Sequence, residues 1–390
     1  MKTNPKSSVS KKFDPFKSDE QLAEFLQNNA FESLKQAIKT TVKIMIKNEM
    51  EVVRKEIDDR IHFNGSYQRN MLSQFGKIEG IDIPRFRQNP AGLELNSTKV
   101  FDFEKERFEN MVAQMHINGI SQRKIKRIAQ LCFGANISTA RVGKVHKDLA
   151  EQESFQINSQ ILDEDFEYLL LDGLWQKTKG FGWDKNEAAL LCALGIRPNG
   201  ERKIIAFSFA RSESFEDWYE LIAQIKKRGL TGKKLKLIIS DDNGGIKKAM
   251  SQLFPSIAFQ ICVVHKMRNV ITKTGYKNKP LLIEDLKHVF NSTSRENAML
   301  RAKEFVKKWY VMEEKAISSF KFNIEECFTY LDFSKEIWSK IRTTNILERE
   351  FREVRRRIKV FDSSFDSQES CERYANTTFT NLNNFYPAVH

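Results

Sequence analysis

The chain has 390 residues, 41% of them hydrophobic and 29% charged, which is ordinary for a soluble globular protein of two or three domains. Its net charge of +13 favours a polyanionic partner, nucleic acid before a membrane surface, although a merely basic protein would show the same balance. No apolar stretch reaches the ~20 residues of a membrane helix, and the N-terminus lacks the apolar core of a signal peptide. Five scattered cysteines indicate free thiols in a reducing compartment. We therefore expect a cytoplasmic protein with no membrane contact.

The first hundred residues contain no evident functional motif. Residues 1–18 form a basic, polar tail that is expected to be disordered until it meets an anion. Region 19–100 is expected to hold two helices, joined near Asn28, followed by a small β-element in which Gly and Pro punctuate short extended runs. The apolar stripe of these helices indicates a packing face rather than a ligand site.

Segment 101–155 is predicted to be a helix-turn-helix DNA-binding domain. One helix ends near Gly119, Ser121 caps a second, and Ser138 caps a third after a Gly-containing turn. Both capped helices place apolar residues inward and basic residues outward. The outward residues expected to contact DNA are Arg123, Lys124, Arg127, Arg141, Lys144 and Lys147. An ordinary helical hairpin with a solvated basic face is the alternative, and the net charge favours DNA binding.

From Asp163 the pattern becomes strand-rich. Strands are predicted at 166–171, 187–196 and 203–210, with a hairpin turn at Asn199-Gly200 between the last two. A helix capped by Ser214, and then strand, helix, strand and helix, complete the order β-β-β-α-β-α-β-α. Three antiparallel strands followed by α/β units describe a ribonuclease H-like core, an α/β fold.

The predicted core is interrupted. Its first part covers 160–269, an all-α insertion covers 270–340, and 341–390 return to the core with one more helix and a tail. A helical insertion of that length inside an α/β domain indicates a task of its own.

Three carboxylates are candidates for one site. Asp172 and Asp241 each end a predicted strand, and the first and fourth strands of this topology are neighbours, so the two side chains would meet at one edge of the sheet. Glu348 lies on a predicted helix, where a capping box with Asn345 and an ion pair with Arg352 would account for it equally well. Together the three predict a site for two hard divalent cations. The basic residues of this helix expected to hold DNA are Arg349, Arg352, Arg355 and Arg356.

From about Asn64 to Val360 the chain resembles the Mutator-type (MULE-related) transposases of bacterial insertion sequences. Six motifs in order carry the resemblance: N-G-I-S-Q-R-K-I (118–125), Y-L-L-L-D-G-L-W (168–175), S-E-S-F-E-D-W (212–218), S-D-D-N-G-G-I-K (240–247), Q-I-C-V-V-H-K-M-R-N (260–269) and R-T-T-N-I-L-E-R (342–349). Each motif is weak alone, and their common order makes the match specific.

The resemblance implies a DDE transposase with Asp172, Asp241 and Glu348 as catalytic metal ligands. It selects Asp241 over Asp242, because the family's ligand directly follows Ser, and leaves Asp242 as a bystander. It also implies two Mg²⁺ or Mn²⁺ ions per site. The DNA partners would be double-stranded transposon ends, with their terminal inverted repeats, and target DNA. A homodimer or higher oligomer on DNA, associated with the nucleoid, is expected.

Cys262 and His265 match the family's C-x-x-H signature. With no second pair nearby they make a poor zinc site, so we expect them to support the site beside Asp241, with catalytic participation of His265 as the lesser alternative. Asn243 stands where the family often has His, which puts proton transfer at that position in doubt.

Two other functions remain open on the sequence. A DNA-binding protein of transposon origin would keep the fold and lose the chemistry, and loss of any of the three carboxylates would have favoured it. A nuclease that cleaves without strand transfer has the same sequence features.

Overall fold

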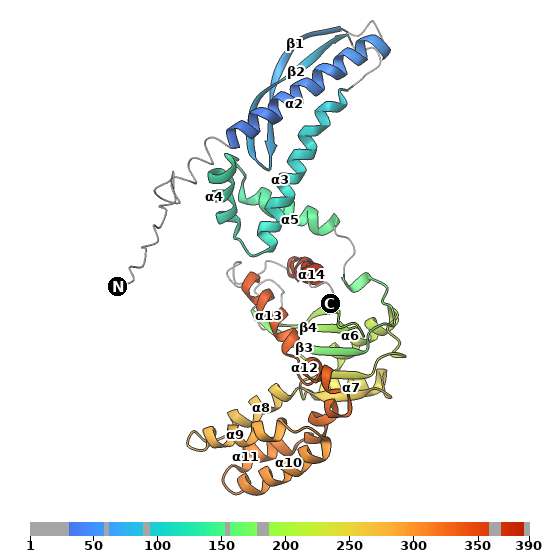
Figure 1. The fold of residues 1–390 in the computed structure, drawn as a ribbon, viewed down its shortest axis with the longest axis vertical. Coiled ribbons are helices and arrows are strands. Elements are labelled where there is room, and N and C mark those ends of the chain that lie inside the picture. The colour runs from blue at the N-terminus through green and yellow to red at the C-terminus, as the bar shows by residue number, and fades with distance from the viewer. Residues whose placement is uncertain are drawn as a thin grey trace, which may run out of the picture. The chain divides into compact units, whose positions relative to one another are not determined.

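The computed structural model describes residues 31–57, 62–88, 94–152, 157–177, 187–358 and 368–385 (Figure 1). The expected tail at 1–18 and the helix junction near Asn28 lie outside these residues. The chain divides into two compact units, Met1–His116 with Gln122–His146, and Ile117–Ser121 with Lys147–His390. We call them the N-terminal unit and the large unit. None of the helices in the described ranges is long and apolar enough to cross a membrane, and all five cysteines are free thiols.

The N-terminal unit contains the small β-element expected from the sequence. Helix α2 (Phe31–Val52) runs into the π-turn η2 (Val53–Ile57), and strands β1 (His62–Ser73) and β2 (Gly76–Gln88) form an antiparallel hairpin. The helix lies against the hairpin because its apolar stripe and the alternate residues of the strands make one core. That core includes Val42, Ile46, Met71, Ile78 and Ile81.

The three helices expected after the hairpin are present. After η3 (Asn96–Lys99) come α3 (Val100–Ile117), α4 (Gln122–Phe133) and α5 (Thr139–Gln152). On α4, Ile125 and Ala129 are buried. Ser138 accepts a hydrogen bond from the Arg141 backbone N–H at 3.1 Å, as an N-cap does.

A mixed five-stranded sheet forms the centre of the large unit and is preceded in the chain by the short η4 (Ile157–Ser159). Its strands are β3 (Tyr168–Lys177), β4 (Glu187–Ile196), β5 (Arg202–Ala210), β6 (Leu237–Ser240) and β7 (Ala258–Ile261). They lie in the order β5-β4-β3-β6-β7, with β3, β4 and β5 antiparallel and β6 and β7 parallel to β3.

Helices cover both faces of this sheet (Figure 1). α6 (Phe215–Lys227), which begins with a Ser214–Asp217 capping box, and α7 (Gly244–Leu253) pack on one face. α8 (Val263–Thr272) follows β7, so the elements run β-β-β-α-β-α-β-α, as expected from the sequence. This α/β arrangement is consistent with a ribonuclease H-like core.

The secondary-structure elements within residues 273–341 are helices, and we call this segment the helical insertion. They comprise α9 (Lys279–Phe290), α10 (Arg295–Trp309), α11 (Glu314–Lys321), η5 (Ile324–Asp332), η6 (Lys335–Ile337) and α12 (Trp338–Ile341). Then come α13 (Asn345–Ile358) and α14 (Gln368–Phe385). The core of the insertion is continuous with the second face of the sheet. Gln260 of β7 secures the junction, because its amide donates to the Cys327 carbonyl at 2.9 Å and accepts from the Tyr330 N–H at 2.7 Å.

Two predicted element boundaries are wrong. β3 continues through Asp172 to Lys177, because its antiparallel partner β4 pairs with it along its whole length while β6 pairs only as far as Leu170. The apolar run 257–264 is not one strand. β7 ends at Ile261 and a helix begins at Val263, so Cys262 is an N-cap and His265 is helical.

Candidate active site

The register of the sheet places Asp172 level with Asp241. Leu170 pairs in parallel with Ile239; Asp172 lies two residues further along β3, and Asp241 lies two residues after Ile239, directly past the end of β6. Side chains alternate along a strand, so Asp172 shares a face with Leu170 and Leu174. Those two residues belong to the core that includes α8 and α13. The Asp172 carboxylate therefore points toward the two helices that carry the remaining residues of the site.

Helices α13 and α8 bring Glu348 and His265 to Asp172. The apolar stripe of α13, with Leu347, Phe351 and Val354 buried, turns Glu348 toward the sheet. His265 Nε2 lies 3.2 Å from Glu348 Oε1. One ligand atom from each of Asp172, His265 and Glu348 lies within 4.8 Å of the other two, a spacing that suits a metal ion.

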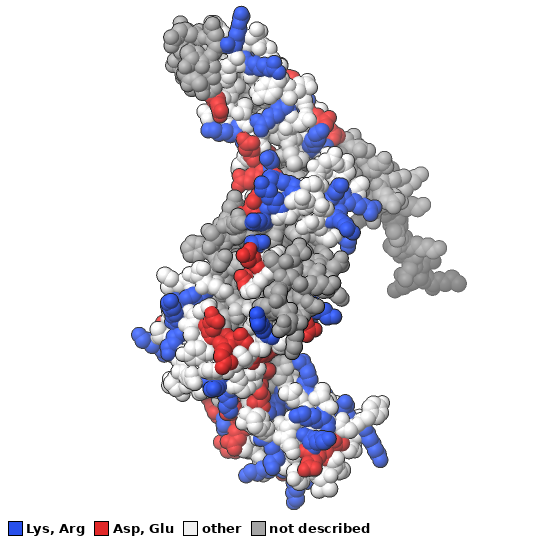
Figure 2. Space-filling model, turned by 180° about the vertical axis from the view of Figure 1, so that it is seen from behind, with Lys and Arg blue, Asp and Glu red and all other residues white. Residues whose placement is uncertain are grey.

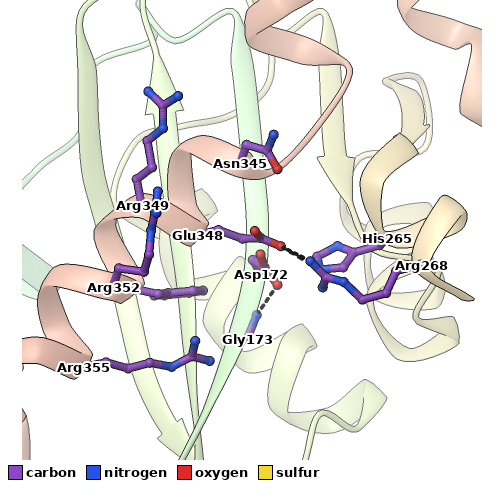
Figure 3. Close-up of a pocket in the computed structure, with 10 residues that line it drawn as sticks. Asp172, Gly173, His265, Arg268, Asn345, Glu348, Arg349, Arg352 and Arg355 are labelled. Carbon is purple, nitrogen blue, oxygen red and sulfur yellow. Dashed lines mark hydrogen bonds and ion pairs between the residues drawn. The ribbon is translucent and has the colours of Figure 1, made fainter. Parts of the chain in front are cut away.

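These residues line an open pocket of about 500 Å³. Figure 3 shows Asp172 and Gly173 on the strand, His265 and Arg268 on one side, and α13 on the other. Arg268, which the sequence analysis missed, lies 3.4 Å from Glu348 Oε1. The remaining cationic side chains in the lining come from successive turns of α13: Arg349, Arg352 and Arg355. An acidic centre with a rim of arginines suits a polyanion that must be held beside a cation.

Burial dominates the electrostatics of the site. It raises the pKa of Asp172 to about 7, although the charge on His265 acts against it. Burial also raises the pKa of Asp241, again against the charge on His265. For His265 burial acts to lower the pKa, but Cys262 and the two carboxylates outweigh it and raise the pKa to about 9. His265 thus supplies the positive charge nearest to Asp172 and Asp241. A divalent cation would further offset the free-energy cost of burying these two charged carboxylates.

Cys262 links the start of α8 to the start of α13. The backbone N–H and the hydroxyl of Thr344 donate to its sulfur at 3.3 and 3.5 Å. Although burial raises the pKa of the thiol, the neighbouring His265 and these donors lower it overall. Cys262 is therefore placed to position Thr344, four residues before Glu348.

Glu213 is a further carboxylate that the sequence analysis missed. A Cβ atom at Gly173 would lie 2.8 Å from Glu213 Oε1, so the glycine after Asp172 leaves room for this carboxyl group. Burial and the charge of Asp241 raise its pKa. Glu213 lies within the quoted motif S-E-S-F-E-D-W, which was the available signal.

Asn243 has a structural role in place of the proton transfer that was in doubt. Its side-chain oxygen accepts from the N–H groups of Gly245 and Ile246 at 2.7 and 3.3 Å and so caps α7. Its amide donates to the Glu213 carbonyl at 3.3 Å. Asn243 therefore fixes the loop that carries Asp241.

The comparisons with known proteins agree on one family. A family model described as "Transposase, Mutator family" matches residues 10–388. The chain belongs to this family of transposases. It is 28% identical over 349 residues to the transposase for insertion sequence element ISRM5 of Rhizobium meliloti, covering 88% of this chain and 85% of that protein. It is also similar to the transposase for IS256 in transposon Tn4001 of Staphylococcus aureus, at 28% identity over 82% of this chain and 80% of the other. The IS905 transposase of Lactococcus lactis is 26% identical over 82% of this chain and 79% of that protein.

As a Mutator-family transposase the protein acts on DNA, and its candidate DNA contacts fall into two groups. On α4 and α5, Arg123, Arg127 and Lys144 are exposed. Arg141 instead lies against Glu109 of α3, with its Nε 3.0 Å from the carboxylate. On α13, Arg356 pairs with Glu353 at 2.8 Å and is not among the residues of the pocket. Basic side chains outside the pocket are interspersed with acidic ones on the face seen in Figure 2.

The transposase offers a divalent cation suitable ligands. Asp172 and Glu348 supply oxygens within the metal-compatible group, and hard cations such as Mg²⁺ prefer such ligands. Asp241 Oδ1 is buried and has no hydrogen-bond partner among the described residues, so it is open to a cation. The residues present therefore fit the divalent metal that the family typically uses.

Proposed function

We propose that this chain is a DDE transposase with a ribonuclease H-like core. It would bind the terminal inverted repeats of its element, hydrolyse phosphodiesters at the element ends and join the freed 3′-hydroxyls to target DNA. The observation that carries this proposal is a pocket rimmed by arginines in which Asp172 of β3 and Glu348 of α13 lie within metal-ligand range of each other and of His265. Asp241, which directly follows β6 and acts on the Asp172 carboxylate through its charge, would complete the acidic site.

The three carboxylates would hold Mg²⁺ or Mn²⁺, and we propose two ions per site. When bound, these cations would activate the attacking oxygen and stabilise the leaving one. Arg268, Arg352 and Arg355 would hold the non-bridging oxygens of the DNA backbone, because guanidinium groups bind phosphates through paired hydrogen bonds. His265 would remain beside Glu348 and orient it.

Both reactions balance without a further co-substrate. In cleavage, a water oxygen bonds to phosphorus, the bond to the 3′-oxygen breaks, and that oxygen takes a proton. In strand transfer, the freed 3′-hydroxyl of the element attacks a phosphodiester of the target DNA and loses its proton. The 3′-oxygen of that target phosphodiester is the leaving group. The number of phosphodiester bonds is conserved in that second step.

We further propose that α4 and α5 read the element ends as a helix-turn-helix, within a DNA-binding domain at 101–155. Support comes from the exposed Arg123, Arg127 and Lys144 opposite buried apolar residues. The two parts of the core, at 160–269 and 341–390, and the helical insertion would form the catalytic part. Assembly as a dimer or larger oligomer on chromosomal DNA would bring two element ends together.

The test is strand transfer by purified protein, with the DNA that flanks its gene as element ends and Mg²⁺ or Mn²⁺ as cofactor. Asp172→Asn, Asp241→Asn and Glu348→Gln should each abolish cleavage and change the Kd for DNA by less than about tenfold. Unimpaired cleavage by any of the three would remove that residue from the site. Binding without cleavage by the wild-type protein would favour a DNA-binding protein of transposon origin, and cleavage without joining would favour a nuclease.

A further inference from the structure

Asp241 and Asp242 are adjacent carboxylates with opposite environments. Asp241 faces the charge on His265 and keeps one buried oxygen without a hydrogen-bond partner in the described structure. Asp242 uses both oxygens. It accepts from Lys266 Nζ at 2.7 Å and from Asn323 Nδ2 at 3.0 Å. Asp242 is therefore tied to other parts of the chain, whereas Asp241 is left available to a ligand.

Lys266 is a buried cation, only 2% exposed. Its ammonium group meets three acceptors: Asp242 Oδ2 at 2.7 Å, the Phe322 carbonyl at 2.6 Å and the Ser319 carbonyl at 3.4 Å. An ammonium group has three donors, so its hydrogen-bonding capacity is filled. Removing a cation from water costs about as much as such contacts return, so a bridge of this kind specifies an arrangement more than it adds stability.

Two of the acceptors for Lys266 and the donor to Asp242 come from one short stretch of the helical insertion. Ser319 lies in the last turn of α11, and Phe322 and Asn323 form the bend between α11 and η5. Asn323 in this bend has φ 52°, and it is the one non-glycine residue with positive φ within the described ranges. Asn tolerates the left-handed region better than most residues do, and such conformations cost free energy that the surrounding contacts must supply. The end of α11 and this bend together direct two carbonyls and one amide toward Lys266 and Asp242.

The positions of the two partners explain why this bridge matters. Asp242 directly follows Asp241, and Lys266 directly follows His265. Neighbouring residues on a helix point about 100° apart, so His265 can face Glu348 while Lys266 faces the insertion. Asn243, the N-cap of α7, directly follows Asp242 in the same loop. The loop is thus held by the two residues after Asp241, while the carboxylate of Asp241 stays open.

We propose that Asp242 and Lys266 are positioning residues that lock the helical insertion onto the loop carrying Asp241 and so set the geometry of the metal site. The inference rests on the proposed function, and it replaces the expectation that Asp242 is a bystander. Correct docking of this one bend determines how Asp241 and His265 are presented to a divalent cation.

The chain offers a matched control. Lys247 of α7 and Glu326 of η5 also form an ion pair between the core and the insertion. Unlike the Asp242–Lys266 pair it is partly exposed, and neither residue adjoins a residue of the acidic site. Lys247→Met therefore weakens docking of the insertion without touching the loop of Asp241.

The experiment measures Mn²⁺ affinity by calorimetry and the cleavage constants kcat and KM, at a temperature where circular dichroism shows each variant folded. Asp242→Asn and Lys266→Met should each lower Mn²⁺ affinity or kcat by about 10–100-fold, as removal of groups that orient metal ligands does. KM for DNA should stay the same. The double variant should be little worse than the worse single variant, because both remove one interaction. Lys247→Met should leave Mn²⁺ affinity and kcat unchanged.

Asn323→Gly provides a milder variant in case Lys266→Met does not fold. It keeps the left-handed bend and removes only the amide bonded to Asp242, and it should lower Mn²⁺ affinity in the same direction. Wild-type Mn²⁺ affinity and kcat in both Asp242→Asn and Asn323→Gly, with only Tm reduced, would show a purely structural bridge and overturn the proposal. An equal loss in Lys247→Met would also overturn it. Failure of the wild-type protein to bind Mn²⁺ or cleave DNA would instead refute the proposed function, and this inference with it.

Discussion

At the scale of single residues, the acidic site is built at a cost in stability. Asp172 is 7% exposed and pairs with no lysine or arginine within 4 Å in the described chain. Burial holds its pKa at about 7, so the folded chain keeps a proton there that the unfolded chain releases near 3.8. Functional sites often trade stability for chemistry in this way.

The pH dependence follows from this raised pKa. Below pH 3.8 Asp172 is protonated in both the folded and the unfolded state, so its burial costs no stability. As the pH rises from 3.8 to about 7, the unfolded state loses this proton first, and the free energy of unfolding falls. Asp172→Asn should therefore raise the Tm of the chelated protein at pH 8 by at least about 2–4 °C, the shift expected for 1 kcal/mol. Thermal unfolding in EDTA measures this.

The rise in Tm caused by Asp172→Asn should be smaller at pH 5, because burial of the carboxyl group costs less stability there than at pH 8. A Tm that is lower than wild type at both pH values would show that the carboxylate stabilises the fold, and it would contradict a destabilising effect of burial at this position.

At the scale of elements, two positions show how closely the sheet and its cover must fit. A Cβ atom at Gly195 of β4 would lie 2.3 Å from the ring of Phe166, which packs over the strand. Gly195→Ala should therefore destabilise the large unit by about 1–3 kcal/mol, the usual effect of overpacking a core. Chemical denaturation measures the change in free energy of unfolding.

Gly244, the first residue of α7, is the matched control. A Cβ atom there meets nothing within 4 Å, and Gly244→Ala should leave stability within about 0.5 kcal/mol of wild type. Equal effects of the two substitutions would mean that Phe166 does not occupy the space above Gly195.

Helix α13 combines a proposed metal ligand with a proposed phosphate-binding face, and its arginines are not equivalent. Arg352 and Arg355 line the pocket, whereas Arg356 is held by Glu353. Replacing Arg352 and Arg355 by Gln should reduce the salt dependence of DNA binding by a slope of about 0.9 for each phosphate that the protein no longer neutralises. Arg356→Gln should change the slope less. Binding isotherms at several salt concentrations distinguish these outcomes. Equal slopes for the wild-type protein, the variant with Arg352 and Arg355 replaced, and Arg356→Gln would contradict the assignment of Arg352 and Arg355 to phosphate binding.

At the scale of the whole molecule, we expect end recognition and chemistry to be separable. The proposed reading helices lie mainly in the N-terminal unit and the acidic site lies in the large unit. Arg127→Ala with Lys144→Ala should weaken binding to the element ends and lower the salt slope by about 2 if each residue contacts one phosphate. Mn²⁺ should still raise the Tm of this double variant, because its acidic site is intact. An unchanged slope would mean that α4 and α5 do not face the DNA.

Arg141 is better left intact in that test. Its guanidinium joins α5 to α3 through Glu109, so its removal would disturb helix packing as well as any DNA contact. The sequence pattern placed Arg141 on the outward face with Lys144, but a charge pattern cannot tell a solvated arginine from one that a neighbouring helix has engaged.

Local signals in the sequence determined the element order, the capped helices and the candidate carboxylates. The apolar run at 187–196, the turn at Gly200 and the Ser214 cap depend on near neighbours in the chain, and all three elements are observed. The six motifs also identified the family, which the comparison over residues 10–388 shows. The roles of Asp172, Asp241 and Glu348 in catalysis stay predictions.

Tertiary structure alone decided which neighbours each side chain meets. Pairing with β4 carried β3 past Asp172, and packing on the sheet made a helix of the residues around His265. Glu213, Arg268 and the Lys266–Asp242 bridge depend on contacts between residues 24 to 80 positions apart, which no local pattern encodes. The hydrogen-bond partners that distinguish Asp242 from Asp241, and the three acceptors of the buried Lys266, are set by the packing of the whole fold.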